Sequence, residues 1–489
     1  MKAKALAAVA TATVVATLGA TALSLRAPSV AVPVNQNFTL TEVTIVNPGR
    51  ARFEHGSIVV AGDRITVAGP RDGMQQTTTA LSEFKGRYIL PGLIDLHAHL
   101  PPKSLLDLSV HAGLMLAAHG VTTVRVVGDT DGSAVPAMQE AIAAGAVGPR
   151  IFNCGPFVVG KIPSRWPNSV VVERADGADQ VVRQLRDQGM NCIKIYEDLD
   201  PPRLMALREA AHRYGLRMIG HLSHGIDYTA GLVDEVQHFH GVPPPASMAR
   251  DHIMDRAIHW DQVSDARLGD VVEATLRNGT ANTPTLSSTA ALLRYRDYPA
   301  TIVADDLRDM PRLYREVAWS PKSGIPFWRG IERRIPEIDQ ALANKRKLVR
   351  MLYDAGATLL VGTDIQQPFV IPGLSVHHEM AEFVAAGIPL EQVWAIATAG
   401  AGQALGQPLL GQLLAGAPAD FLIFREDPTT SLANLDTLEA VVINGRLHRA
   451  EDLQQARTAW RAHFEDPIFD AVSMRAGRRM LAKNVLRDY

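Results

Sequence analysis

The chain has 489 residues, of which 47% are hydrophobic and 20% are charged, and its formal net charge is -2. This length is too great for one ordinary core and fits one large domain with a smaller one. The balanced charge argues against nucleic acid or an anionic membrane surface as a partner.

The first residues have the order of a secretory signal peptide. Lys2 and Lys4 precede an apolar run that begins at Ala5, and Ala20-Thr21-Ala22 offers a small-residue cleavage site. The run is shorter than the roughly 20 residues that a spanning helix needs, so an uncleaved anchor is the weaker alternative. We predict a secreted or periplasmic protein without an integral membrane domain after signal removal. The predicted segments are a signal peptide, residues 1–22, and a linker, residues 23–37.

Residues 38–90 have the texture of antiparallel strands. Short β-branched runs cover Phe38–Val46, Ser57–Ala61 and Arg64–Ala68, and Gly62-Asp63 marks a tight turn. Similar runs return in residues 401–450, at Phe421–Phe424 and Val441–Ile443. We therefore predict one small β-domain, a sandwich built from both chain ends.

Residues 91–400 alternate short apolar runs with helical patterns. Eight such β-then-α units are typical of a closed parallel (β/α)8 TIM barrel, so the fold class is α/β. The expected strands are Leu93–His97, Thr122–Val127, Arg150–Cys154, Cys192–Tyr196, Arg217–His221, Glu235–His238, Ala281–Leu286 and Thr358–Thr363.

Two further segments carry no chemistry in the sequence. Residues 290–336 form a long insertion before the eighth expected strand, either a lid or a helical elaboration on the outside. Residues 451–489 are charged and have a helical pattern, so we expect a C-terminal helical extension. The two cysteines, Cys154 and Cys192, lie in apolar runs, and we expect them to be buried free thiols.

The sharpest local signal is a His-x-His pair at the end of an apolar strand. His97 and His99 are two residues apart, so both side chains point to one face, the expected mouth of the barrel. Two converging imidazoles make half of a metal site. The pair alone would be read as ordinary core or surface histidines.

Lys194 is flanked by Ile193 and Ile195 in a strand that reads as buried. A lysine in such a strand is costly unless paired, and desolvation lowers its pKa. The neutral amine can add carbon dioxide, and the resulting carbamate is an anionic ligand able to bridge two metals. A lysine that reaches solvent from the strand end is the alternative.

Further candidate ligands close other expected strands. His221 and His238 each end a strand, and Asp364 ends the eighth, where barrel enzymes place catalytic groups. An isolated Asp after a strand is usually a helix cap, but here it completes a set of six candidate ligands. His224 and His240 lie nearby and are read as polar mouth residues, with a ligand role left open.

From Val43 to Gly445 the chain resembles the amidohydrolase superfamily, close to its imidazolonepropionase-like and prolidase-like (Xaa-Pro dipeptidase-like) branch. The motifs occur in the family's order along the chain. They are Pro91-Gly-Leu-Ile-Asp-Leu-His-Ala-His99, Gly120-Val-Thr-Thr-Val124, Ile193-Lys-Ile195, His221, Val236-Gln-His238, Thr283-Pro-Thr285-Leu286, Gly362-Thr-Asp364 and Val442-Ile-Asn-Gly445. Gln237 stands where the family commonly has a Glu.

This resemblance implies a barrel with a small β-sandwich and a two-metal site. His97, His99 and Asp364 would hold one metal, and His221 and His238 the other. Carboxylated Lys194 would bridge them, and zinc is the usual metal in this branch. Metal-activated hydroxide would attack the substrate carbonyl, and Asp364 would carry the proton to the leaving nitrogen.

The substrate is predicted to be a small molecule or short peptide with an amide bond, a dipeptide or an N-acyl amino acid. Weaker candidates for substrate contacts are Tyr196, Tyr228, His240 and Arg250. The alternatives are a hydrolase of a cyclic amide, a lactone or a xenobiotic amide or ester, and an inactive secreted binding protein. A homo-oligomer is left open.

Overall fold

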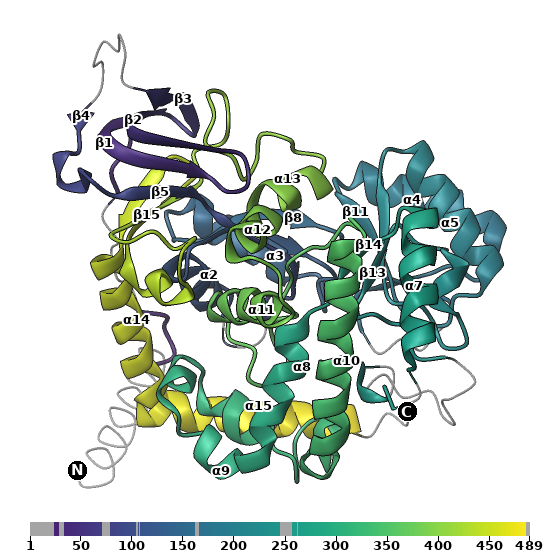
Figure 1. The fold of residues 1–489 in the computed structure, drawn as a ribbon. Helices are drawn as coiled ribbons and strands as arrows, with labels where there is room; N and C mark the ends of the chain where they lie inside the picture. The colour runs from purple at the N-terminus through teal and green to yellow at the C-terminus, as the bar shows by residue number, and fades with distance from the viewer. Residues whose placement is uncertain are drawn as a thin grey trace, which may run out of the picture. The chain divides into compact units, whose positions relative to one another are not determined.

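The computed structural model describes residues 24–28, 34–70, 79–103, 106, 108–161, 166–244, 257–261 and 263–485 (Figure 1). The predicted signal peptide and Arg250 lie outside these residues. The chain divides into two compact units. The larger unit is formed by Val32–Leu293 and Arg334–Leu453, and the smaller one includes Arg294–Arg333 and Gln454–Tyr489.

In the larger unit, strands from both ends of the chain share one eight-stranded sheet, which is purple and yellow in Figure 1. Its order is β17-β16-β15-β5-β1-β2-β3, with β4 beside β1. Strand β5 is central, because it pairs with β1 in parallel and with β15 in antiparallel register. The strands are β1 (Phe38–Asn47), β2 (Ala51–Ala61), β3 (Arg64–Pro70), β4 (Thr79–Ala80), β5 (Tyr88–Pro91), β15 (Phe421–Phe424), β16 (Leu438–Ile443) and β17 (Arg446–Arg449).

The remaining strands run parallel in two sheets, ordered β6-β7-β8 and β10-β9-β11-β12-β13-β14. All residues of β6, β7 and β11 are buried, as continuous apolar strands covered on both faces should be. The strands are β6 (Leu93–Ala98), β7 (Val121–Val126), β8 (Arg150–Asn153), β9 (Phe157–Val159), β10 (Ser169–Val171), β11 (Cys192–Ile195), β12 (Arg217–Gly220), β13 (Glu235–Gln237) and β14 (Ala281–Thr283).

Helices follow most of the parallel strands. Several begin with a side-chain cap, for example Asp200 before α5 and Ser264 before α7, each accepting a backbone N–H. The α-helices of this unit are α2 (Ser109–Ala118), α3 (Ala134–Ala143), α4 (Ala178–Asp187), α5 (Pro201–Arg213), α7 (Asp265–Asn278), α8 (Leu286–Leu292), α10 (Ile335–Asp354), α11 (Leu374–Ala385), α12 (Leu390–Ala395) and α13 (Ala401–Ala404).

The expected eighth strand, Thr358–Thr363, is wrong as a regular strand. Only Leu359 forms a bridge, with Asn282 of β14. The backbone of this segment hydrogen-bonds to two different neighbours. Leu360 donates to the Asn282 carbonyl at 2.9 Å, and Leu96 of β6 donates to the Val361 carbonyl at 3.0 Å. It therefore links the two parallel sheets without forming a ladder with either.

The expectation of free thiols is also wrong, because Cys154 and Cys192 form a disulfide. Cys154 follows β8 and Cys192 begins β11, and Asn191 donates to the Asn153 carbonyl at 2.8 Å beside them. The two Cα atoms lie 4.6 Å apart, within bridging range. Sequence spacing alone does not show that these two strand ends meet.

Loss of this disulfide is expected to lower the free energy of unfolding by roughly 4 kcal/mol, since it closes a loop of 38 residues in the unfolded chain. Denaturant unfolding of the oxidised protein and of the Cys154→Ala/Cys192→Ala variant measures the difference. Thiol titration of the unfolded chain should find two thiols only after reduction. Two thiols without reductant would contradict the bond.

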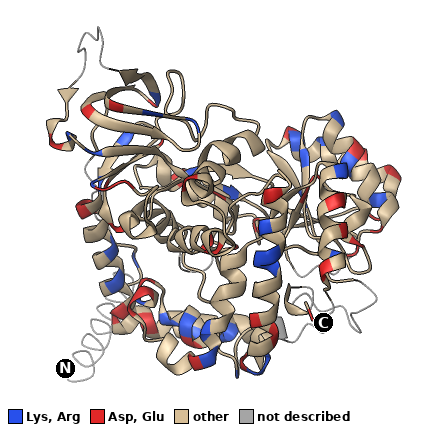
Figure 2. Cartoon of the chain, in the orientation of Figure 1, with Lys and Arg blue, Asp and Glu red and all other residues tan. Residues whose placement is uncertain are grey.

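The smaller unit is helical. It contains residues 294–333 of the predicted insertion 290–336, which form short helical turns with α9 (Tyr298–Thr301). It also contains most of α14 (Ala450–Glu465) and the helix α15 (Pro467–Val485). Ion pairs hold the two parts together: Asp309 accepts from Arg457 at 2.7 Å and from Arg461 at 2.8 Å. Figure 2 shows charged residues of both signs over this unit.

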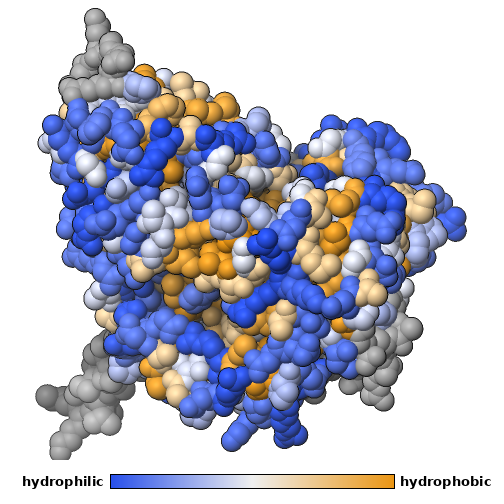
Figure 3. Space-filling model, viewed as in Figure 1, coloured by the Kyte–Doolittle hydropathy of each residue, from blue (hydrophilic) through white to orange (hydrophobic). Residues whose placement is uncertain are grey.

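No helix among the described residues is long and apolar enough to cross a bilayer. Hydrophilic residues cover much of the face seen in Figure 3, and hydrophobic residues gather in patches between them.

Candidate active site

Three ligand-capable side chains meet at the carboxyl end of β6. His97 lies in the strand and His99 follows it, and the Nε2 atom of each lies 3.3 Å from Asp364 Oδ1. Ligand atoms of these three residues lie within 4.8 Å of one another. The strand end brings both histidines to one side, as the two-residue spacing predicts.

A second carboxylate, Asp95, clamps the two segments that carry this cluster. It accepts the backbone N–H groups of His97 and Thr363 at 3.1 Å each and the Thr363 hydroxyl at 2.6 Å. Asp364 itself has a left-handed backbone, φ 63°, and its N–H donates to the His97 carbonyl at 2.8 Å. Such a conformation persists only where the surroundings over-determine it, and these bonds do so.

Two further histidines lie beside the cluster. The rings of His221 and His238, which follow β12 and β13, are 4.9 Å apart, and His238 is 4.6 Å from His97. His238 Nε2 lies 3.9 Å from Asp364 Oδ2. His240 packs on His221, with ring centroids 4.5 Å apart, whereas His224 is exposed. The structure thus places His97, His99 and His238 around Asp364 and packs His221 on His238.

Hydrogen bonds fix the direction of two of these rings. His99 Nδ1 lies 3.0 Å from the Gly128 carbonyl, and His238 Nδ1 lies 2.7 Å from Thr285 Oγ1. The Gly128 carbonyl can only accept, so His99 Nδ1 carries the proton and its Nε2 lone pair faces Asp364. The Thr285 hydroxyl orients the His238 ring so that its Nε2 also faces Asp364, as outer partners orient metal-ligating histidines.

The buried nitrogens test whether a metal would fit. Within the described part of the chain, Nδ1 of His97 and Nδ1 of His221 have no hydrogen-bond partner, and Nε2 of His97 faces the Asp364 carboxylate at 3.3 Å without a well-formed hydrogen bond. Burial lowers the pKa of His97 to about 3 and keeps the pKa values of His221 and His238 well below normal, so the imidazoles are neutral near pH 7. Neutral imidazoles with one carboxylate suit zinc and similar divalent ions.

Lys194 lies in β11 and is fully buried. Burial lowers its pKa to about 7, although the Asp364 and Glu235 carboxylates act in the opposite direction. A large fraction is therefore the neutral amine at neutral pH, the form that adds carbon dioxide. Its Nζ donates to Gln237 Oε1, the residue at which the sequence departs from the family pattern.

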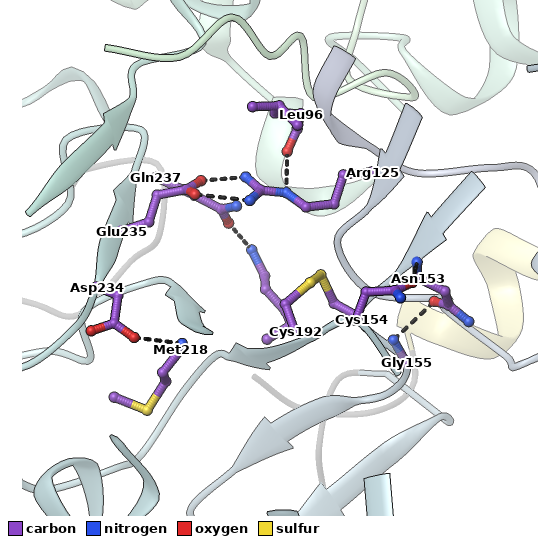
Figure 4. The surroundings of a disulfide bond; sticks show 12 residues. Leu96, Arg125, Asn153, Cys154, Gly155, Cys192, Met218, Asp234, Glu235 and Gln237 are labelled. Atoms are coloured by element: carbon purple, nitrogen blue, oxygen red, sulfur yellow. Dashed lines mark hydrogen bonds and ion pairs between the residues drawn. A yellow bond between two sulfur atoms is a disulfide. The ribbon is translucent and has the colours of Figure 1, made fainter. Parts of the chain in front are cut away.

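Beside Gln237 lies a buried ion pair that the sequence did not reveal, between Arg125 and Glu235 (Figure 4). Arg125 of β7 donates to both carboxylate oxygens of Glu235 and, at 2.8 Å, to the Leu96 carbonyl. Thr283 Oγ1 donates to Glu235 at 2.6 Å. Burial alone would raise the pKa of Glu235, but Arg125 and these hydrogen bonds hold it below normal. Both residues were concealed within runs read as apolar strands.

Of the predicted substrate contacts, Tyr196 lies at the site and Tyr228 does not. Tyr196 lies at the cluster, its ring 4.6 Å from that of His221 and 5.1 Å from Phe157. The prediction that Tyr228 contacts the substrate is wrong, because its buried hydroxyl is hydrogen-bonded to Thr275 at 2.8 Å and to Asn282 at 2.9 Å. These bonds use the hydroxyl for packing, and burial raises its pKa to about 12.

The model of the amidohydrolase family matches residues 88–448. No curated protein matches the chain by sequence. Among solved structures, bottromycin amidohydrolase is similar at 22% identity and TM-score 0.65, covering 90% of this chain and 92% of that one. A Xaa-Pro dipeptidase with bound methionine is similar at 20% identity and TM-score 0.60, with coverage of 84% and 100%. The ochratoxinase of A. niger is similar at 16% identity and TM-score 0.58, with coverage of 84% and 95%.

Proposed function

Because the chain belongs to the amidohydrolase family and is a hydrolase of carbon–nitrogen bonds, we propose that it cleaves the amide bond of a dipeptide or an N-acyl amino acid at a two-metal site. The observation that carries the proposal is the meeting of His97, His99 and Asp364, with His221 and His238 beside them.

In this proposal His97, His99 and Asp364 would hold one metal, and His221 and His238 would hold the other. Lys194, once carboxylated, would serve as the ligand shared by both, which its burial and lowered pKa favour. When bound, the divalent ions, zinc by the chemistry of the donor set, lower the pKa of water and polarise the substrate carbonyl.

The protein's own part in the reaction is proton transfer by Asp364. One of its oxygens faces His97 and His99, and the other faces His238, so the carboxylate lies between both proposed sets of ligands. His97 and His238 hold the pKa of Asp364 well below normal against the effect of burial, so the carboxylate is ionised near neutral pH. In the reaction it takes the proton that the attacking water releases. It then returns that proton to the leaving nitrogen as general acid.

The substrate class rests on the likeness to a Xaa-Pro dipeptidase and to bottromycin amidohydrolase, both named for cleavage of amide bonds. Tyr196 and His240, which pack on His221, are the proposed contacts for the substrate. A short peptide or acylated amino acid meets these requirements.

We further propose that the two parallel sheets close into one (β/α)8 barrel, and that the eight-stranded sheet is the sandwich built from both chain ends. Hydrogen bonds at both seams support closure: Asn191 to Asn153 joins β11 to β8, and Leu96 to Val361 joins β6 to the segment beside β14. The ligands would then lie at the carboxyl-terminal mouth, the usual place for catalytic groups.

Secretion or export to the periplasm is part of the proposal. The Cys154–Cys192 disulfide supports it, since such bonds persist in oxidising compartments and are rare in the cytosol. Expression of the full chain in a bacterial host, with N-terminal sequencing of the exported product, tests it. Cleavage near residue 22 is the expected result, and an uncleaved cytoplasmic product would contradict it.

Replacing Lys194 by alanine is expected to remove metal and activity together. We expect about two zinc ions per chain in the wild type. The variant should bind less, and kcat/KM should fall by more than the roughly 10- to 100-fold that loss of an outer partner costs. Elemental analysis measures the metal, and amine release from dipeptides and N-acyl amino acids measures the activity.

Two controls sharpen this experiment. A short carboxylic acid such as propionate, added to Lys194→Ala, should restore part of the activity by supplying a carboxylate where the lysine stood. Lys347→Ala removes an exposed lysine paired with Asp265 and should leave metal and rate unchanged. Metal content unaffected by Lys194→Ala would reject the bridging carbamate, and a wild type without metal would reject the two-metal site.

A further inference from the structure

The first turn of helix α8 lacks its ordinary cap. Thr285 occupies the N-cap position, where a threonine hydroxyl usually accepts a backbone N–H of the next residues. Here its backbone is left-handed, φ 49°, and its side chain makes no cap hydrogen bond. The N–H groups at this buried helix end therefore need another acceptor, because buried N–H groups without partners are costly.

The hydroxyl of Thr285 is directed instead at His238. The two side chains are hydrogen-bonded at 2.7 Å, both residues are buried, and His238 is also left-handed, φ 60°. In the tautomer that leaves Nε2 as a metal ligand, Nδ1–H donates to Thr285 Oγ1. His238 and its hydrogen-bond partner Thr285 thus both have left-handed backbones. Each such conformation is strained and persists only where surrounding contacts stabilise it.

Glu379 supplies the missing acceptor. It lies on α11, is fully buried, and its two carboxylate oxygens accept the N–H groups of Leu286 at 3.0 Å and Ser287 at 2.5 Å. These are the two residues that directly follow Thr285. Burial raises the pKa of Glu379 to about 8, and the bonded N–H groups act against that rise. A carboxyl group from another helix thus replaces the cap that Thr285 does not provide.

We propose that Glu379 is a positioning residue for His238: it caps α8 in place of Thr285, and so frees the Thr285 hydroxyl to hold the imidazole. This inference rests on the proposed role of His238 as a metal ligand. It predicts that, without Glu379, Thr285 turns back to cap its own helix and releases His238.

The alternative is that Glu379 only stabilises α8, and two readouts separate the roles. One is the tautomer of His238, read from the imidazole nitrogen shifts of the metal-free full chain labelled with [15N]histidine. The other is zinc affinity, measured by competition with a chelator. A purely structural role would lower the midpoint of unfolding and change neither quantity.

The test compares Glu379→Leu, Glu379→Gln and Thr285→Val with the wild type. We expect Glu379→Leu and Thr285→Val to weaken zinc binding by about 10- to 100-fold, as loss of an outer-shell partner does. Both should also mix the two tautomers of His238. Glu379→Gln keeps one acceptor oxygen and should give a smaller loss. The Thr285→Val/Glu379→Leu variant should lose no more affinity than either single variant, because both act on one imidazole.

Matched variants complete the design. Glu382→Gln, on the same helix but paired with Arg346 at 2.6 Å, should leave affinity and tautomer unchanged. Thr285→Ser keeps the hydroxyl and should retain the wild-type zinc affinity and the single His238 tautomer. If Glu379→Leu does not fold, Glu379→Gln and Thr285→Val give the same two readouts.

Wild-type zinc affinity and a single His238 tautomer in a folded Glu379 variant would overturn the proposal. The same result in Thr285→Val would overturn it as well. A wild type that binds no zinc would reject the two-metal site, while the tautomer in the metal-free chain would still decide the role of Glu379.

Discussion

Replacing Asp364 by asparagine is expected to lower kcat by about 100- to 10,000-fold, the range attributed to one proton-transferring group. The amide oxygen can still reach a metal. The amide cannot accept a proton, as the carboxylate that lies between His97 and His238 does in the proposed reaction. Steady-state kinetics at saturating metal measure kcat separately from metal binding. KM should change much less than kcat, because the lost contact is made to the reacting proton.

The same variant should not lose stability in its metal-free form, since it removes a buried charge from the site. Asp265→Asn, an exposed carboxylate paired with Lys347, is the matched control and should keep the wild-type rate. A fall in kcat of less than about 10-fold at saturating metal would assign proton transfer to another group, since this lies below the range for such a group.

Replacing Arg125 by methionine is expected to lower the free energy of unfolding by about 3–5 kcal/mol. The guanidinium is the cationic partner of Glu235, and both side chains are almost fully buried, with 2% and 1% exposure. Without it the carboxylate stays in the interior, where the Thr283 hydroxyl still donates to it. Denaturant unfolding of the full-length protein measures the change.

A double variant shows where that cost arises. Arg125→Met/Glu235→Leu removes both charges, and it should recover most of the stability, because a buried pair is often replaceable by apolar groups. Arg350→Met breaks an exposed pair with Asp354 and should have little effect. A double variant as unstable as Arg125→Met would contradict this explanation and indicate that shape, not charge, dominates.

The candidate ligands could be predicted from the sequence because each carries a local signal. His97 and His99 share one strand face through their spacing, and Lys194 is conspicuous as a charge between two isoleucines. Their supporting residues carry no such signal. Asp95 acts on Thr363, 268 residues away, and Glu379 acts on Leu286, 93 residues away. Only the folded chain brings these partners together.

Strand prediction missed two short elements, although β13 and β14, which also have three residues each, were expected. Strands β9 and β10 have three residues each, too few to show a two-residue period, and they were not expected. Segment 358–363 looked like a strand because Leu359, Leu360 and Val361 form an apolar run. Such a run does not reveal that the backbone hydrogen bonds of the segment are divided between two neighbours. Tyr228 was assigned to substrate for a related reason, since its position near His221 in sequence did not show where its hydroxyl points.

The shared sheet has a consequence for the order of events during biosynthesis. Strand β5 pairs with β15, and Leu90 faces Leu422 in that register, so one edge of β5 has no partner until more than 300 further residues have been made. The apolar side chains of β1 and β2 share a core with Phe421 and Ile423, so part of this core stays unfilled until those residues have been made. A nascent chain must therefore keep an open, aggregation-prone edge through most of its translation, and exporting it before the sheet closes would avoid that hazard.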